Sequence, residues 1–367
     1  MKKIKKLVRN PEIFFRDYLN KRYPIINNEQ QITEPEEAIL IKNDINLSVQ
    51  DTTIYSNNPI IDVVFTWVNN NDDKWLKKYK THTEKYSLDT IGLYANDQAR
   101  FSNHNELFYS VQSIEKFMPW VRQIYIVTDD QEPDWLDKNN RKIKVIDHKE
   151  IIKEEFLPTF NSHIIEAHLH KIEGLSENFI YFNDDVFVAR KLLPQHFFRS
   201  NGIASLFIAT KSLKNMQQKG KMTPTLAASQ NGAALLKKYF SANIDAPLVH
   251  TYVPLKKSAY SKAWNLFHSE IQAFLPNKFR TNSDLNLATF LVPWLMYLDG
   301  QSVFEREICY YFNIRSPHAL TQYNNLIKNQ KSGASPHSFC ANDFNSEKST
   351  KQYQQNLINL LEKYYRD

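Results

Sequence analysis

The sequence predicts an α/β fold in which a mixed, largely parallel sheet is flanked by helices, with further helical additions. One observation predicts this class, and a second narrows the kinds of protein within it. Short apolar, β-rich runs at residues 60–68, 123–127, 143–146 and 179–187 alternate with segments of helical periodicity. The chain also has only 7 glycines in 367 residues, and no GxGxxG or GxxxxGK motif. Because it lacks a glycine-rich phosphate-binding loop, a dehydrogenase or a P-loop kinase is disfavoured.

Each element has a local signal. The first apolar run leads into a polar loop, Asn69 to Asp73. A helix is predicted over 107–117, where apolar residues recur at helical spacing, and Pro119 ends it. A second helix, over about 162–172, precedes the run that begins at Phe179. This alternation of strand and helix is what predicts parallel strands covered by helices.

The run from Phe179 to Phe187 is the most informative stretch, because an apolar strand ends in Asn183, Asp184 and Asp185. Open α/β sheets place their ligands at the carboxyl ends of strands. Oxygen-only ligands suit Mg²⁺ or Mn²⁺, so we expect a divalent cation here. The alternative is a polar turn that merely ends the strand, since Asn and Asp are common turn formers.

Composition narrows the class of protein. With 42% hydrophobic and 13% aromatic residues, the chain can build a sizeable core. Its two cysteines, Cys309 and Cys340, have no metal-site spacing and indicate a reducing compartment. No apolar stretch reaches the roughly 18 to 20 residues of a membrane span, and the N-terminus does not resemble a secretory signal. We therefore expect a cytoplasmic protein.

The domain plan is expected to have four parts. Residues 1–24 form a basic amphipathic segment, which either lies on anionic lipid or packs as a solvated helix. Nucleic acid binding is not expected, because no basic face extends beyond this segment. Residues 25–58 are a polar linker, residues 59–346 the catalytic body, and residues 347–367 a closing helix that packs on the body or on a partner.

Several longer motifs together resemble the Stealth family of sugar-1-phosphate transferases. They occur in the family's order and cover about residues 60 to 345. The motifs are Asp62-Val-Val-Phe-Thr-Trp67-Val68, Arg100-Phe-x4-Glu106-Leu, Ser113-Ile-Glu-Lys-x-x-Pro119-Trp-Val, Leu157-Pro-Thr-Phe-Asn161-Ser162-His163, Phe182-Asn-Asp-Asp-Val-Phe187, His250-x3-Pro254-x-x-Lys257, Phe279-Arg280-x3-Asp284 and Phe339-Cys-x-Asn342-Asp343. The resemblance implies a nucleotide-sugar-transferase-like fold.

One loop departs from the family pattern. Relatives commonly carry Trp-Val-Asp or Asn-Gly-Ser-Asp where this chain has Trp67-Val-Asn69-Asn70-Asn71-Asp72. Asn tolerates left-handed backbone better than most residues, so Asn70 is expected to replace the missing glycine.

The resemblance implies that hexose-1-phosphate, in particular N-acetylhexosamine-1-phosphate, moves from a UDP-sugar to a hydroxyl of a polysaccharide or oligosaccharide acceptor. UMP leaves and a phosphodiester of capsular or other cell-surface polysaccharide forms. Such chemistry requires charge neutralisation and in-line placement more than covalent work by the protein. Peripheral contact with the inner membrane surface or with capsule-assembly proteins would fit this role. Residues 211–235, rich in lysine, are interpreted as a mobile basic insertion near the acceptor site.

The resemblance also assigns roles to residues. Mg²⁺ or Mn²⁺ is expected on Asn183, Asp185, Asn342 and Asp343. Asp184 then contacts the sugar or acts as base, because neighbours in an extended strand point to opposite faces. His250 is expected to act as a general base or as a hydrogen-bond donor to a phosphate. Arg280 is expected to bind a phosphate oxygen, with Asp284 orienting it from the same helical face. The residues expected to bind the donor are Asp62, Trp67, Asn69, Asp72, Arg100, Glu106, Asn161, Ser162, His163 and Lys257.

Some of these residues also have structural interpretations. An Arg280/Asp284 pair can be an ordinary surface ion pair, an Arg100/Glu106 pair can tie a loop to the body, and Lys257 can be solvated. Two alternative functions stay open as well. One is a metal-dependent glycosyltransferase that releases UDP, and the other is a non-catalytic carbohydrate-binding protein.

Overall fold

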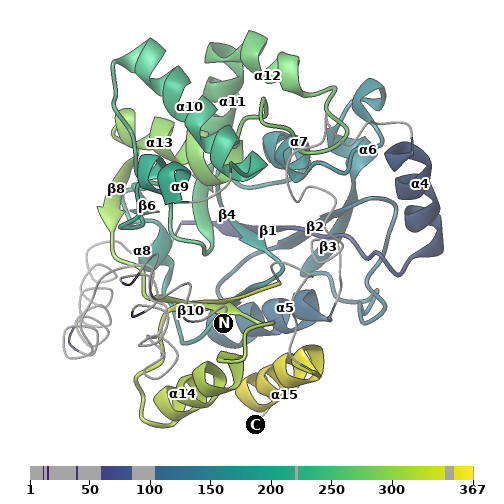
Figure 1. Cartoon of the computed structure of the whole chain (residues 1–367), viewed down its shortest axis with the longest axis vertical. Coiled ribbons are helices and arrows are strands. Elements are labelled where there is room, and N and C mark those ends of the chain that lie inside the picture. Colours follow the sequence, from purple (N-terminus) through teal and green to yellow (C-terminus); the bar gives the residue numbers. More distant parts are fainter. Residues whose placement is uncertain are drawn as a thin grey trace.

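A computed structural model describes residues 59–84, 104–219, 222–343 and 351–366, together with Pro11, Phe15 and Ile39 (Figure 1). Apart from those three residues, the basic segment 1–24 and the linker 25–58 lie outside the described residues, as does Arg100. The four domain boundaries therefore stay predictions.

The centre of the molecule is a five-stranded sheet in the order β3-β2-β1-β4-β7. Its first four strands are parallel, and β7 runs antiparallel to β4. A three-stranded sheet, β5-β10-β9, and a two-stranded sheet, β6-β8, lie beside it. The strands are β1 (Ile61–Thr66), β2 (Ile124–Thr128), β3 (Ile143–Asp147), β4 (Asn178–Asn183), β5 (Val186–Val188), β6 (Ala204–Phe207), β7 (Val253–Lys256), β8 (Ser302–Glu305), β9 (Cys309–Asn313) and β10 (Ser338–Asn342).

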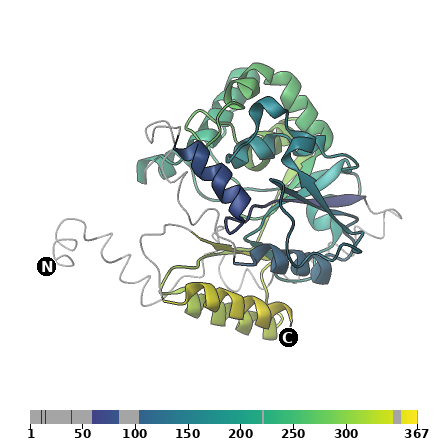
Figure 2. The same ribbon diagram turned by 90° about the vertical axis from the view of Figure 1, so that its right-hand side faces the viewer.

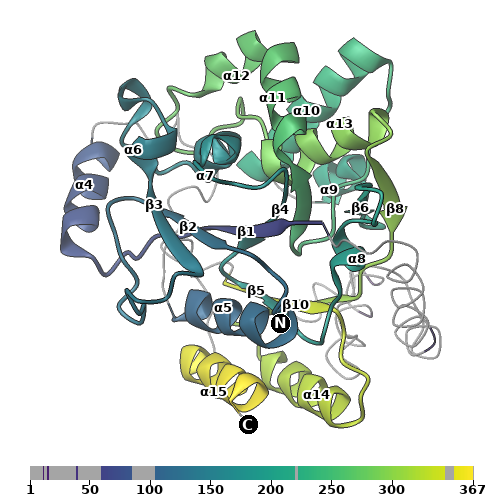
Figure 3. The ribbon, with the colours of Figure 1, turned by 180° about the vertical axis from the view of Figure 1, so that it is seen from behind.

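Helices cover both faces of the central sheet. In Figures 1 and 3, α7 and α10 to α13 lie on one side, and α5, α14 and α15 on the other. The helices are α4 (Asp73–Thr83), α5 (Glu106–Phe117), α6 (His148–Ile151), α7 (Ser162–Ala167), α8 (Pro194–Phe197), α9 (Leu213–Lys219), α10 (Pro224–Phe240), α11 (Lys257–Leu266), α12 (His268–Phe274), α13 (Val292–Leu298), α14 (Ala319–Lys331) and α15 (Tyr353–Tyr365). Short turns of other helix types are η3 (Glu154–Phe156), η4 (Leu169–Lys171) and η5 (Leu287–Leu291).

The predicted fold class is confirmed. β1 and β2 are buried along nearly their whole length, as expected for parallel strands covered on both faces. The helix expected over 162–172 is shorter than predicted, because α7 ends at Ala167 and a 3₁₀ turn follows. The insertion expected at 211–235 includes α9 and most of α10, which continues to Phe240 and buries Leu226, Leu235 and Leu236.

The run from Phe179 to Phe187 is two strands rather than one. β4 belongs to the central sheet and β5 to the three-stranded sheet, and the chain turns between them at Asp184 and Asp185. This turn places the two carboxylates where the two sheets meet.

The C-terminal helix packs on the body of the protein. Figure 2 shows α15 beside α14 beneath the sheets, and α15 also contacts α5. Its apolar face buries Leu357, Leu361 and Tyr364, and the Tyr364 hydroxyl donates a hydrogen bond to the Ala189 carbonyl at 2.7 Å. Within the described ranges, every helix is too short or too polar to cross a bilayer.

Candidate active site

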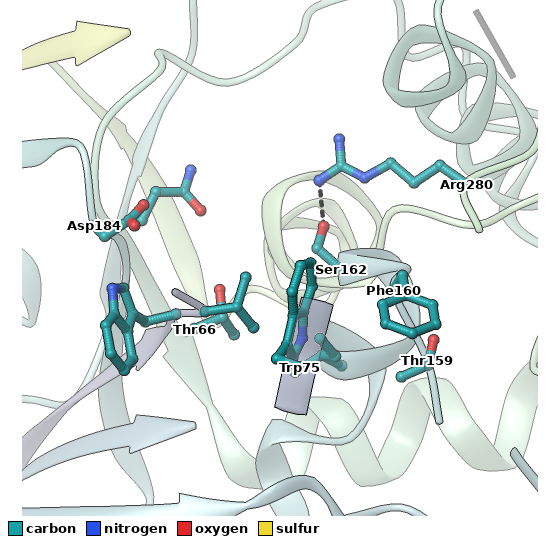
Figure 4. A pocket seen from close by; sticks show the side chains of 11 residues that line it. Thr66, Trp75, Thr159, Phe160, Ser162, Asp184 and Arg280 are labelled. Carbon is teal, nitrogen blue, oxygen red and sulfur yellow. Dashed lines mark hydrogen bonds between the residues drawn. The ribbon is translucent and has the colours of Figure 1, made fainter. Parts of the chain in front are cut away.

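Two pockets open at the carboxyl ends of β1 and β4. The first, which we call the aromatic pocket, has a volume of about 140 Å³. Figure 4 shows it with Asp184 and Arg280 on opposite sides, and with Trp75 and Phe160 below Arg280 in this view. It is lined by Thr66, Trp67, Val68, Trp75, Thr159, Phe160, Ser162, Ile165, Asn183, Asp184 and Arg280.

The second, which we call the wide pocket, has a volume of about 400 Å³. It is rich in hydroxyl and amide groups from α10 and η5, such as Thr225, Ser229 and Thr289, and Lys211 adds a positive charge. His163, Glu166 and His250 line it too. Asn183 and Arg280 line both pockets, so a ligand in one pocket meets a ligand in the other at these two side chains.

The turn after β4 concentrates negative charge. Burial raises the pKa of Asp184 well above its ordinary value, and the neighbouring carboxylates of Asp185 and Glu106 raise it further. Burial likewise raises the pKa of Glu106 to about 7. Three carboxyl groups this close favour a bound cation or proton.

The residues around Asp185 fit a divalent cation. One ligand atom each from Asp185, His250 and Cys340 lie within 4.8 Å of one another. Asn342 Nδ2 donates to Asp185 Oδ2 at 3.2 Å, while Asp185 Oδ1 is buried without a hydrogen-bond partner. An acceptor left in this way normally has a water or an ion as its partner. The expected cation site is supported, but with nitrogen and sulfur atoms beside it in place of an oxygen-only set.

Asp343 faces away from this group. Its carboxylate accepts hydrogen bonds from Arg315 Nε and Nη2, the latter at 2.9 Å, and lies 3.3 Å from His104 Nε2. Burial alone would raise the pKa of Asp343, but the hydrogen bonds and charges of His104 and Arg315 hold it below its ordinary value. A carboxylate already neutralised by a guanidinium is a poor metal ligand, so we do not retain Asp343 among the proposed ligands.

Glu106 is connected to Asp343 through His104. The Glu106 carboxylate accepts the His104 backbone N–H at 2.6 Å. Glu106 lines neither of these two pockets, and its proposed contact with a sugar stays a prediction. We interpret it as a residue that holds the start of α5 beside the turn at Asp184.

Arg280 is buried deeply enough that desolvation lowers its pKa, while the charge of Glu166 raises it. Its Nη1 donates to Thr225 Oγ1 at 3.0 Å, and its Nη2 to Ser162 Oγ. Ser162 Oγ in turn donates to Glu166 Oε1 at 2.7 Å. The Arg280 Nε is buried and has no hydrogen-bond partner. The guanidinium is thus held at the boundary of the two pockets with a donor to spare.

Asp284 does not orient Arg280 along a helical face, because the chain between them is an irregular turn after α12. Its buried carboxylate instead accepts Asn161 Nδ2 at 2.8 Å and His163 Nδ1 at 3.0 Å, and it also ties down the turn through Thr281. Burial alone would raise the pKa of Asp284, but the hydrogen bond and charge of His163, with the hydrogen bonds of Asn277 and Thr281, hold it below its ordinary value. Asp284 therefore positions the start of α7.

Asn161 and His163 share this positioning role. The Asn161 side chain caps α7 and is fully buried, so it does not reach a ligand in either pocket. His163 lines the wide pocket, and its Nε2 is buried without a partner. Burial, then the charge of Arg280, lowers its pKa, which favours a neutral ring with Nδ1–H directed at Asp284. Only Ser162 of the three faces the aromatic pocket.

The loop after β1 forms one wall of the aromatic pocket through Trp67 and Val68. Asn69 is held by Gln131, which accepts its N–H and donates to its carbonyl, both at 2.8 Å. The Asp72 side chain caps α4 by accepting the Trp75 N–H at 2.7 Å. Asn70 is not among the described residues with positive φ, so the expected left-handed replacement for glycine is not observed. Asn69 and Asp72 shape this loop rather than line the pocket.

Two predicted donor-binding residues lie at the other end of the sheet. Asp62 stands at the start of β1, where its buried carboxylate accepts Arg122 Nε at 2.8 Å and the Ser176 N–H at 2.7 Å. Lys257 follows β7, whose last residue, Lys256, pairs with the first residue of β4. Because β7 is antiparallel, Lys257 lies far from Asn183. The structure therefore places neither Asp62 nor Lys257 at the end of the sheet where donor binding was predicted.

Asp62→Asn is therefore expected to reduce stability and leave catalysis intact. Loss of the charge-assisted bonds to Arg122 and Ser176 should lower the free energy of unfolding by about 1 to 3 kcal/mol. Urea denaturation measures that change, and the transfer rate per folded molecule should equal that of the parent protein. A selective loss of donor binding in a folded Asp62→Asn protein would restore Asp62 to the site.

Sequence reasoning missed three side chains at this site. Cys340 donates to Asp185 Oδ2 at 3.3 Å, Arg315 neutralises Asp343, and the rings of Tyr311 and His250 make a T-shaped contact. Of these three side chains, only Cys340 could have been predicted from the sequence. Residues two apart on a strand face the same side, so a ligand at Asn342 implies that Cys340 faces the ion as well.

The region called Stealth protein CR2, conserved region 2, matches residues 100–206. The capsular polysaccharide phosphotransferase LcbA of Neisseria meningitidis is 56% identical over 367 residues, with complete coverage of both chains. The capsular polysaccharide phosphotransferase of Actinobacillus suis is 56% identical, over 99% of this chain and 98% of its own. A crystal structure of the galactosyltransferase LgtC with donor and acceptor sugar analogues is 12% identical, covers 82% of this chain and 95% of its own, and has a TM-score of 0.42.

The cleft at the carboxyl ends of the strands, together with relatives of this identity, defines a transferase. The chain belongs to the Stealth family of capsular polysaccharide phosphotransferases.

Proposed function

We propose that this protein transfers a hexose-1-phosphate from a UDP-sugar to a hydroxyl of a capsular polysaccharide acceptor, and releases UMP. The observation that carries the proposal is the pair of pockets that share Asn183 and Arg280. A transfer reaction needs two ligand sites that meet at the reacting group, and a single binding site would not need the second pocket.

The aromatic pocket is proposed to hold the nucleotide. Trp67, Trp75 and Phe160 offer ring surfaces for a base, and Ser162 lies at the start of α7, next to Arg280. The Arg280 fork then faces the diphosphate, where a guanidinium can donate two hydrogen bonds to non-bridging oxygens. The wide pocket, with its hydroxyl and amide lining, is proposed to hold the acceptor saccharide.

A divalent cation at Asp185, His250, Cys340 and Asn342 would neutralise the diphosphate and stabilise the departing UMP. The chain's own groups do the remaining work. Arg280 binds and orients the phosphoryl group, and Asp184, on the opposite side of the aromatic pocket, is placed to contact the sugar or to accept the hydroxyl proton. His163 Nε2 offers a second acceptor on the wide pocket.

The bond that breaks decides between the proposal and its rival. Purified protein is incubated with a panel of UDP-sugars, a divalent cation and a capsule-fragment acceptor. We expect cation-dependent release of UMP and a new phosphodiester signal in the ³¹P NMR spectrum of the acceptor product. Release of UDP with no phosphorus in the product would instead identify a glycosyltransferase.

In that assay, Asp185→Asn tests the proposed ion site, and Asp299→Asn is its matched control. Asp185→Asn keeps the size of the side chain but removes charge at the proposed ion site, so product should fall to background. Asp299→Asn, on an ion pair with Lys262 that lines neither pocket, should behave like the parent protein. Binding of a saccharide with no nucleotide release from any donor would favour a carbohydrate-binding role.

A further inference from the structure

The cation site contains a sulfur atom that an oxygen-only ligand set would not have. Cys340 lies in the middle of β10 and is fully buried. Its Sγ is 3.3 Å from Asp185 Oδ2 and belongs to the same group of ligand atoms as His250. We propose that Cys340 is a ligand of the cation, so that the site selects a borderline ion such as Zn²⁺ over Mg²⁺.

The register between β10 and β5 brings Cys340 close to Asp185. β10 pairs with β5 so that Cys340 lies opposite Val186, the first residue after the turn at Asp184 and Asp185. The Ala341 N–H donates to the Asp185 carbonyl at 2.9 Å, which fixes the turn against β10. Backbone pairing, not chance rotation of a side chain, therefore brings Cys340 to the carboxylate.

Successive side chains of β10 point to opposite faces, and this decides which of them face Asp185. Cys340 and Asn342 share one face of the strand, and both donate to the same oxygen, Asp185 Oδ2. Asp343 turns the other way, to Arg315. The sequence predicted the Asp343 carboxylate as a ligand beside Asp185, but in the structure the Cys340 thiol lies there.

His250 completes the group. Its Nε2 is 4.0 Å from Asp185 Oδ2, and its ring makes a T-shaped contact with Tyr311 at a centroid distance of 5.7 Å. A set of one carboxylate, one imidazole and one thiol contains two groups that bind Zn²⁺ or Co²⁺ well and Mg²⁺ poorly. When such an ion binds, the metal–sulfur bond replaces the S–H bond, and the thiol proton passes to solvent.

The second cysteine of the chain provides a matched control. Cys309 is equally buried and lies on β9, the strand next to β10, where it pairs with Ser338. Its Sγ donates to the His250 carbonyl at 3.5 Å, but it does not belong to the group of ligand atoms. Cys309→Ser and Cys340→Ser therefore make the same chemical change one strand apart.

The test is a titration of the whole protein with Co²⁺, followed by absorption spectroscopy and without any sugar donor. We expect a near-ultraviolet sulfur-to-cobalt charge-transfer band in the parent protein and in Cys309→Ser, and no such band in Cys340→Ser. We also expect Cys340→Ser to lose at least about tenfold in Zn²⁺ affinity, with Mg²⁺ affinity unchanged, because each factor of ten corresponds to about 1.4 kcal/mol.

A second measurement removes dependence on the variants. X-ray absorption of the parent protein with one equivalent of Zn²⁺ should show a sulfur neighbour at about 2.3 Å. Co²⁺ that binds without a charge-transfer band, or Zn²⁺ with only nitrogen and oxygen neighbours, would reduce Cys340 to a hydrogen-bond donor for Asp185 and overturn the proposal. Failure to bind any divalent ion would overturn it as well. The inference rests on the proposed cation site, but these readouts do not depend on which bond the enzyme breaks.

Discussion

Replacing Arg280 with lysine is expected to slow the proposed transfer by about 100- to 1000-fold, the usual cost of removing one donor aimed at developing charge. Lysine keeps the positive charge but offers a single nitrogen. It cannot hold Thr225 and Ser162 together while donating to a phosphate oxygen, as the Arg280 fork can. Steady-state kinetics of UMP release measure the effect, which should fall mainly on kcat.

The matched control is Arg199→Lys. Arg199 is a half-exposed arginine that pairs with Glu305 and lines neither pocket, so its kinetics should stay at the parent level. Thermal unfolding should confirm that Arg280→Lys is folded. A folded Arg280→Lys protein with the parent's kcat would remove Arg280 from the reacting phosphoryl group.

The central part of the fold was predictable because its signals are local. β1, β2 and β4 are apolar runs buried on both faces, and the helical spacing over 107–117 produced α5 almost residue for residue. The three-stranded sheet was not predicted. Its strands are short, and although the strand that begins at Phe179 was expected to end at Asn183, nothing in the sequence marks Val186 to Val188 as a strand of a second sheet.

Site residues were predicted correctly where they lie at the carboxyl end of a parallel strand. They were placed wrongly where their position depends on the direction of the strand or on the face to which the side chain points. Asn183 is the last residue of β4, Trp67 directly follows β1, and both line the aromatic pocket. Lys257 follows β7, but β7 runs the other way, and a motif alone does not reveal that direction. Asp343 was predicted as a ligand and Cys340 was not, for a related reason, since only alternation along β10 tells which of them faces Asp185.

Arg280 and Asp284 show a different limit. Their i, i+4 spacing suggested one helical face, but the chain after α12 makes a turn held by Asp284 itself. Asp284 therefore acts on Arg280 only at a distance, through the start of α7, where Ser162 contacts the guanidinium. Sequence reasoning found both residues and gave one of them the wrong partner.

The largest expected loss of stability lies outside the active site, at Glu307. This carboxylate is fully buried, and several side chains of the described residues contact it. They include His196 at 2.9 Å, His337 at 3.3 Å, Tyr252 at 2.9 Å and Ser338 at 2.7 Å. The group joins the three-stranded sheet to α8 and to the start of β7. Glu307→Leu should lower the free energy of unfolding by about 3 to 5 kcal/mol, because it leaves buried polar partners without their acceptor.

The same carboxylate should make stability depend on pH. Burial alone would raise the pKa of Glu307, but His337 and His196 hold it far below its ordinary value of 4.5. A depressed folded-state pKa stabilises the protein above the unfolded-state pKa, and that stabilisation is lost as the pH falls through the range below about 4.5. Urea denaturation should therefore show a large gap between the parent and Glu307→Gln at pH 7, and a smaller gap at pH 4.

Glu305→Gln tests whether burial is the cause. Glu305 lies two residues away and is 35% exposed in its pair with Arg199, so its loss should cost less than about 1 kcal/mol at either pH. Equal effects of the two substitutions would mean that the histidines do not hold Glu307 in its charged form. A gap for Glu307→Gln that grows in acid would contradict the depressed pKa, because the charged carboxylate would then contribute most where it is most readily protonated.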